Sequence, residues 1–348
     1  MHLGFLPLTG LAVLIGAVLI LPLSSRKVEE ELEAFLWAMG LIAVTVSGRW
    51  SLHLCGQALL EPVNITLAVL LAGFLFRLAR PHLRRAADRL VGLVGLRATM
   101  AGAVFLLGVS SGAITAIIAA LVLSEAAAAL RLDRAGRTRF VVCACYAIGL
   151  GAALTPLGEP LSTIVVAKLK GPPHFADFTY LARLLGWWIV PGIALCAGLS
   201  AVKAQPSGAG PQALAEGAPE TSGGVLLRAG KTYIFVMALV LLGAGLAPLA
   251  ERTLAVAPGW AIFWLNSVSA VIDNATLAAA EIVPAMDARR IVFALLGMLI
   301  SGGMLIPGNI PNIICAGKLG IRSREWAAAA VPMGLAMMAG CFALLLFL

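Results

Sequence analysis

The sequence has few charged side chains: Asp, Glu, Lys and Arg make up 12% of its 348 residues, whereas 61% are hydrophobic. A soluble globular domain is about 25% charged and about 45–50% apolar. The mean hydropathy of +0.98 points the same way. The composition therefore excludes an ordinary soluble domain and predicts an all-α polytopic membrane protein with the lipid bilayer as its main partner.

Motifs of common enzyme and metal sites are also missing. The chain contains no HExxH, GxSxG, P-loop or CxxC, and no second aspartate spaced for an intramembrane aspartyl dyad. The six cysteines are scattered through apolar segments, and the four histidines do not cluster with carboxylates. We therefore expect no catalytic residue, resident metal or cofactor, and the protein is not expected to be an enzyme.

The net charge of +8 would suggest nucleic-acid binding in a soluble protein. Here the positive residues lie mostly between apolar segments, where they report orientation. The basic loops 77–89 (RLARPHLRRAADR) and 131–139 (RLDRAGRTR) are expected to face the cytoplasm. The sequence thus predicts a multi-pass protein of the inner membrane without a nucleic-acid partner.

A membrane-spanning helix needs roughly 20 apolar residues. The first such segment is about Leu3–Leu23, and a retained helix is favoured over a signal peptide because Arg26 and Lys27 follow it and no A-x-A-like site is obvious. We expect about 8 spans and 2 hairpins in all. Further segments are about Leu32–Gly48, Val63–Leu78, Leu184–Val202, Tyr233–Leu249 and Trp326–Leu348.

Two apolar segments are interrupted by similar sequences, GAALTPLGEP at 151–160 and GGMLIPGNIP at 302–311. Proline lacks an amide donor and clashes with the preceding helical turn. A backbone opened inside a bilayer must find partners in protein or in a water-filled cavity. These interruptions predict two broken helices, at about 140–169 and 291–319, that build a site.

Each broken helix follows a segment that enters and returns on the same side of the membrane. The first, about 90–130, turns around Gly108–Gly112, and the second, about 259–286, turns at about Asn266–Thr276. Either segment could be two complete spans or a re-entrant hairpin. Following the orientation from the basic loops gives the two halves opposite topology, which is the inverted-repeat plan of secondary transporters.

This plan divides the chain into four parts. Residues 203–230, rich in Gly, Pro, Ala and Ser, are expected to form a flexible cytoplasmic linker. It would separate N-terminal scaffold helices (1–59) and a first repeat (60–202) from an inverted second repeat (231–348).

The polar feature that stands out is Asp273-Asn274, within FWLNSVSAVIDNATLAAA. An intramembrane carboxylate is costly and normally faces a cavity or a partner. Ser269, Asn274 and Thr276 add oxygen atoms of the kind that hard cations prefer. The alternative is a residue near the membrane surface or a structural carboxylic acid.

The other candidates lie at the first turn and at the two interruptions. Glu159 could carry a proton, or it could cap the helix that follows it. Amides and hydroxyls could ligate an ion, satisfy broken backbone or allow close helix packing. These candidates are Ser110, Ser111, Thr115, Asn309 and Asn312.

SVSAVIDNAT followed by GGMLIPGNIPN, and SSGAIT followed by GAALTPLGEPLS, resemble the ion transporter superfamily, which includes sodium/proton antiporters, arsenite pumps and citrate or dicarboxylate transporters. The chain is most similar to its small family of predicted cation transporters. The resemblance implies two hairpins whose tips, Ser110–Thr115 and Ser269–Thr276, meet unwound segments at Thr155–Ser162 and Pro307–Asn312. It adds Thr155 and Ser162 to the candidates, and a homodimer by analogy. The first hairpin departs from the antiporters because it lacks an acid–amide pair.

These observations favour a secondary active transporter for a monovalent cation, with sodium/proton antiport first. Asp273 would bind Na+, and a proton would compete there or at Glu159. Sodium-coupled symport of a small organic or inorganic anion is the alternative, because helix N-termini can hold anions. An intramembrane enzyme and a channel are weaker alternatives.

Overall fold

The computed structural model describes residues 5–130, 132–202, 222–254, 258–272 and 274–347, and the elements of these segments are helices. The first half contains α1 Phe5–Ser24, α2 Arg26–Glu30, α3 Leu32–Ser47, α4 Leu52–Val94, α5 Leu96–Ile114, α6 Ala116–Ala129, α7 Arg134–Ala152, α8 Pro160–Lys168 and α9 Tyr180–Ala201. The second contains α11 Ser222–Leu254, α12 Gly259–Leu265, the 3-10 helix η1 Asn266–Ala270, α13 Asn274–Glu281, α14 Ala288–Ser301, the 3-10 helix η2 Ile306–Gly308, α15 Ile310–Leu319 and α16 Ser323–Leu346.

Helices long and apolar enough to cross a membrane confirm the polytopic helical class. Within the described residues there are 5 such helices: Leu52–Leu71 of α4, α5, α9, Ala229–Leu249 of α11, and α16. Shorter apolar helices accompany them, among them Leu32–Ser47, Ala116–Ala129 and Ile310–Leu319. The protein is therefore a multi-pass membrane protein with several helices too short to span a bilayer by themselves.

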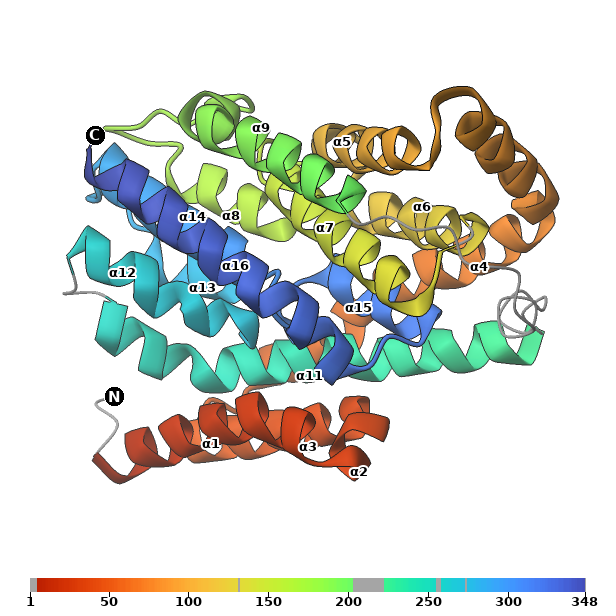
Figure 1. The fold of residues 1–348 in the computed structure, drawn as a ribbon. Helices are drawn as coiled ribbons and strands as arrows, with labels where there is room; N and C mark the ends of the chain where they lie inside the picture. Colours follow the sequence, from red (N-terminus) through yellow and green to blue (C-terminus); the bar gives the residue numbers. More distant parts are fainter. Residues whose placement is uncertain (1–4, 131, 203–221, 255–257, 273, 348) are drawn as a thin grey trace.

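The helices form a layered bundle in which α11 separates the N-terminal helices from the rest. In Figure 1, α1, α2 and α3 lie below α11, and α7, α8, α9, α14 and α16 lie above it. A Cβ atom built on Gly245 of α11 would lie 2.5 Å from the Cβ atom of Ala43 on α3. Small residues allow this close approach of two helices, as is usual inside membranes.

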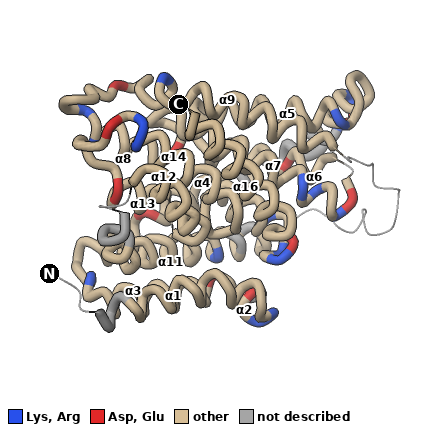
Figure 2. The backbone as a smooth tube through the Cα atoms, turned by 60° about the vertical axis from the view of Figure 1, so that its left-hand side comes forward, with Lys and Arg blue, Asp and Glu red and all other residues tan. Residues whose placement is uncertain are grey.

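Charged residues are concentrated away from the middle of the bundle. Figure 2 shows the Lys, Arg, Asp and Glu segments mostly toward the ends of the helices, with the central part largely uncharged. Side chains such as Phe140, Phe263 and Trp326 are fully buried in the apolar core. Polar groups that do lie in this interior are costly, so their partners are informative.

The structure corrects two expected loops. The basic segment 77–89 lies inside α4, and 134–139 forms the first turns of α7. Arg, Leu and Ala are strong helix formers, and they outnumber the single proline of the first segment. Helix α11 likewise begins at Ser222, inside the expected linker, whereas 203–221 lies outside the described residues.

The two predicted helix interruptions are confirmed. Helix α7 ends at Ala152 and α8 begins at Pro160, while α14 ends at Ser301 and α15 begins at Ile310. Pro160 and Pro311 occupy the first or second position of the helices that resume, where a missing amide donor costs least. The prolines thus end one helix and begin the next.

The first turn lies later than expected. Gly108–Gly112 is helical within α5, and the chain changes direction at Thr115, which has a φ of 73°. Within this helical segment, the Oγ atom of Ser111 lies 2.7 Å from the Gly108 carbonyl oxygen of its own helix. A serine-glycine run therefore did not mark the turn itself.

Candidate functional site

The first interruption is held together by contacts between its own backbone and α5 and α6. The Ala116 amide, at the start of α6, donates to the Gly158 carbonyl at 2.9 Å. Thr155 donates its Oγ1 hydrogen to the Gly112 carbonyl on α5, and Ser162 donates to the Ala152 carbonyl at 3.3 Å. The opened backbone thus finds its partners in protein, as burial demands.

The second interruption is built in the same way with an amide in place of the hydroxyl. Asn312 is fully buried, and its Nδ2 donates to the carbonyls of Gly302 and Leu305, each at 2.9 Å. Its Oδ1 atom has no hydrogen-bond partner within the described parts of the chain. This leaves one buried amide oxygen available to a ligand.

Both interruptions fold back so tightly that only glycine fits at their bends. A Cβ atom on Gly158 would lie 2.0 Å from the Ala152 carbonyl oxygen, and one on Gly308 would lie 2.5 Å from the Gly302 carbonyl oxygen. Both distances are far inside van der Waals contact. The loop between the two helix segments therefore closes on the end of the helix before it in each case.

A serine from a preceding element bonds to the helix before each interruption. Ser111 of α5 donates to the Ile148 carbonyl of α7 at 2.9 Å. Ser269 of η1 donates to the Met298 carbonyl of α14 at 3.1 Å and also to the side-chain oxygen of Asn274. Both serines are fully buried. Their carbonyl partners each lie about one turn before a helix end.

The side-chain amide of Asn274 lies against Gly302, at the start of the second interruption. A Cβ atom on Gly302 would lie 2.9 Å from its Nδ2 and 3.0 Å from its Oδ1. Its Nδ2 atom has no hydrogen-bond partner among the described residues. Thr276 points instead toward α11, where a Cβ atom on Gly243 would lie 2.5 Å from its Oγ1. Asp273 lies outside the described residues.

Glu159 and Asn309 occupy matching positions at the start of α8 and α15. Both are N-cap residues with extended backbone and both are 8% exposed, but neither caps the helix through its side chain. A Cβ atom on Gly149 of α7 would lie 2.7 Å from the Nδ2 of Asn309. The second interruption therefore touches the helix that precedes the first.

The structure brings most of the predicted residues to the interruptions, but not all. Ser110 donates weakly to the Leu107 carbonyl of its own helix at 3.4 Å, and the hydroxyl of Thr115 accepts from the Ile118 amide at 3.4 Å. These two residues serve the helix ends. The group at the interruptions comprises Ser111, Thr155, Glu159, Ser162, Ser269, Asn274, Asn309 and Asn312.

Sequence reasoning missed the polar contacts that connect the two halves. Lys318 on α15 forms a buried ion pair with Glu125 on α6. Lys168 on α8 donates to the carbonyls of Ala279 and Ile282 on and after α13, the latter at 3.1 Å. Lys168 and Lys318 each follow one of the two interruptions in the sequence. The matching positions of the two lysines after the interruptions were the sequence feature that could have indicated these contacts.

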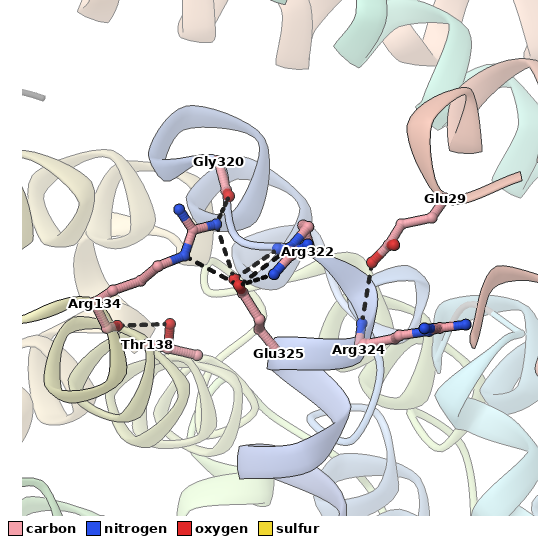
Figure 3. A network of polar contacts seen from close by, with 7 residues as sticks. All are labelled: Glu29, Arg134, Thr138, Gly320, Arg322, Arg324 and Glu325. Atoms are coloured by element: carbon pink, nitrogen blue, oxygen red, sulfur yellow. Dashed lines mark hydrogen bonds and ion pairs between the residues drawn. The ribbon is translucent and has the colours of Figure 1, made fainter. Parts of the chain in front are cut away.

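A charged network joins α7, α15 and α16 at one end of the bundle (Figure 3). Arg134 donates to both carboxylate oxygens of Glu325, at 3.0 and 3.1 Å, and to the Gly320 carbonyl at 3.2 Å. Arg322 donates to Glu325 at 2.7 Å, and the Arg324 amide donates to Glu29 at 3.3 Å. Arg134 is one of the residues expected to face the cytoplasm.

The chemistry available at the interruptions is that of buried neutral oxygen atoms with one carboxylate, Glu159. Such oxygens suit hard cations. Among the described residues no group of three His, Cys, Asp or Glu side chains could hold a metal ion. The described parts of the group therefore offer oxygen atoms but no preformed metal cage.

Comparison with known families gives one match over nearly the whole chain. A family model described as "Protein of unknown function (DUF1646)" matches residues 8–348. No curated protein matches the sequence.

Proposed function

The chain belongs to the DUF1646 family, and from that premise we propose that it is a secondary active transporter of a small monovalent cation, with sodium/proton antiport as the mode. The proposal includes two structural repeats of opposite orientation and alternating access to a site between them. It assigns no catalytic step and no resident cofactor to the chain.

The observation that carries the proposal is the recurrence of one set of contacts at equal spacing along the chain. Gly158 closes on the Ala152 carbonyl, and Gly308 closes on the Gly302 carbonyl. The polar residue four positions after each glycine, Ser162 or Asn312, donates to that same carbonyl. Lys168 and Lys318 also lie at equal distances in the sequence after Gly158 and Gly308.

The two sets run in opposite directions. In Figure 1, the path from α7 to α8 runs from right to left, whereas the path from α14 to α15 runs from left to right. Each resumed helix also packs on the other half, since α15 contacts α6 and α8 contacts α13. Broken helices in matching positions of inverted halves are the common architecture of secondary transporters.

A cation is favoured by the kind of polar group that is buried. Asn312 presents an unshared amide oxygen, and the oxygens of Ser269 and Asn274 lie against the same interruption. Asp273 is adjacent to Asn274 in the sequence, and Glu159 lies at the other interruption. We propose that Na+ binds near Asp273 and that protons compete for these carboxylates.

A second candidate is sodium-coupled symport of a small anion. The observation in its favour is that α8 and α15 both begin inside the protein at Glu159 and Asn309 without a side-chain cap. Backbone amides at such helix ends can hold an anion. Uptake of such an anion driven by a sodium gradient would support symport in place of antiport.

For orientation, we propose that the end carrying Arg134, Arg137 and Arg139 faces the cytoplasm of the inner membrane. The linker 203–230 would lie on the same side, and a homodimer is proposed by analogy only. Cysteine labelling of Arg137→Cys and Pro173→Cys in a cysteine-free background, in intact cells and in inverted vesicles, tests this orientation.

The central experiment is flux in proteoliposomes of the purified chain. A sodium gradient is expected to drive proton movement, read with a trapped pH dye. Asp273→Asn is expected to abolish it, and Asn312→Ala to weaken it. Asp177→Asn is the matched control, because Asp177 is an exposed acid paired with Arg183.

A further comparison uses neighbouring serines. Ser111→Ala removes the bond to the Ile148 carbonyl and is expected to impair exchange, whereas Ser110→Ala changes only a bond within α5. Unchanged exchange in Asp273→Asn would overturn the cation site. Sodium-driven anion uptake without proton movement would replace antiport by symport.

A further inference from the structure

A second buried carboxyl lies away from the interruptions, at the end of α13. Glu281 is 7% exposed, and its Oε2 accepts a hydrogen bond from the Nδ2 of Asn266 at 3.0 Å. The same Nδ2 donates to the Ala294 carbonyl of α14 at 3.1 Å. Asn266 is fully buried at the start of η1. Neither residue has a role in the transport proposal above.

The two side chains leave two oxygen atoms without a donor. Among the described residues neither the Oε1 of Glu281 nor the Oδ1 of Asn266 has a hydrogen-bond partner. Both atoms are acceptors when the carboxyl is ionised, and leaving buried acceptors unsatisfied is costly. A proton on Oε1 turns that oxygen into a donor. The carboxylic acid and the amide can then form a pair with two hydrogen bonds.

Among the described side chains, the charged and titratable groups on the elements packed against α13 lie on α8, on α11 and at the start of α14, and one more follows α8. They are Lys168, Lys231, Tyr233, Asp287, Arg289, Arg290 and His174. Most are engaged elsewhere. Lys231 pairs with Glu33, Asp287 caps α14, Arg289 donates to the Leu345 carbonyl, and His174 contacts the Met286 carbonyl.

Lys168 lies near Glu281, and Arg290 acts on its charge. The ammonium group of Lys168 is held on the carbonyls of Ala279 and Ile282, which flank Glu281 in the chain. Arg290 adds a favourable charge interaction with the carboxylate. Burial favours the neutral carboxyl, and the hydrogen bond from Asn266 and the charge of Arg290 oppose it by favouring the ionised form.

We propose that Glu281 and Asn266 form a proton-binding site, in which the proton is carried on Oε1 of Glu281 and donated to Oδ1 of Asn266. The proton is taken from water and returned to it, so no other reactant is needed. The existence of this site is independent of transport. Its use as the coupling proton of exchange rests on the proposed function.

Glu125 provides the matched comparison. It is the buried glutamate of α6, with the same 7% exposure, but Lys318 pairs with it directly. A direct ion pair favours the carboxylate. Glu125→Gln therefore controls for the replacement of a buried glutamate at a place where the carboxylate has a direct basic partner.

The test is an infrared pH titration of the full-length protein in detergent micelles, which reads protonated carboxyl groups directly. We expect a carboxylic-acid C=O band that decays as the pH rises from acidic to alkaline. Glu281→Gln should remove one component of this band, and Glu125→Gln should leave that component in place. In Asn266→Leu it should remain but move in frequency, because its acceptor is lost.

A titrating acid band that is identical in the wild-type protein and in Glu281→Gln would overturn the proposal. Glutamine matches the shape of the neutral acid and can donate to Asn266, so folding is expected to survive. Selective ¹³C labelling of glutamate in the wild-type protein gives a second reading without any mutation. A titrating band with no sodium-driven flux would reject the transport proposal alone.

Discussion

At one end of the bundle, Lys318 on α15 pairs with the buried Glu125 on α6. At the other end, Lys168 has the corresponding place on α8, but it bonds to carbonyls of α13, and the nearby Glu281 bonds to Asn266. Figure 1 shows α6 with α15 and α8 with α13 on opposite sides of the molecule. At one end, which we call the closed end, the lysine and the glutamate form a direct ion pair. At the other, the open end, the lysine and the glutamate have separate partners.

This difference separates a structural role from a titrating one. A buried ion pair keeps both charges in place, since neither can be lost without exposing the other to a low-dielectric interior. A carboxyl with one amide partner can take up a proton at little cost. The end with Lys318 also carries the Arg134–Glu325 network, so charge pairing is concentrated there.

The largest expected effect comes from opening the closed end. Glu125→Gln leaves the buried ammonium of Lys318 without its countercharge, and we expect a loss of about 3–5 kcal/mol in the free energy of unfolding. Reversible unfolding in detergent by a denaturing surfactant measures it. Adding Lys318→Met to the same chain should recover most of the loss.

Glu281→Gln is the control at the open end. Its amide keeps the contact with Asn266, so we expect a change within about 0.5–1.5 kcal/mol. Equal losses for Glu125→Gln and Glu281→Gln would remove the distinction between the two ends.

The sequence predicted the two interruptions because proline and glycine act locally. Pro160 and Pro311 determine where a helix can begin, whatever surrounds them. The turn at Thr115 was misplaced because residues 108–112 continue α5, where Ser111 packs on α7 and bonds to the Ile148 carbonyl, a contact between separate helices. The partner of Lys318 could not be predicted, because Glu125 lies far away in the sequence and reaches it only through the packing of α6 on α15.

A smaller effect is expected from the lysine of the open end. Lys168→Met removes two hydrogen bonds to carbonyls but leaves no buried countercharge in a direct pair. We expect a loss of roughly 1.5–3 kcal/mol, the range for hydrogen bonds that involve a charged group. The same unfolding measurement applies. A loss as large as that of Glu125→Gln would mean that Lys168 also acts mainly as a counter-ion.

The two interruptions allow a test of whether the halves are equivalent. A methyl group on Gly158 or Gly308 would overlap a backbone carbonyl, which cannot move aside as a side chain can. We expect Gly158→Ala and Gly308→Ala each to cost about 1–3 kcal/mol. Gly317→Ala is the control, because open space surrounds that position. A large cost at one glycine only would argue against matching repeats.

The smallest effect is expected at the surface network, which shows how far the closed end depends on exposed charge. The side chain of Glu325 is 22% exposed and that of its partner Arg134 is 56% exposed. Exposed ion pairs contribute about 0–1 kcal/mol and are screened by salt. Glu325→Gln should therefore lower the free energy of unfolding by about 1 kcal/mol at most.

Raising the salt concentration should reduce that loss further. The loss in Glu125→Gln should persist in high salt, because the side chains of Lys318 and Glu125 are only 10% and 8% exposed and a buried pair is screened much less. If salt abolished both losses, the Glu125–Lys318 pair would behave as a solvated contact, and the contrast between the two ends would rest on Glu281 alone.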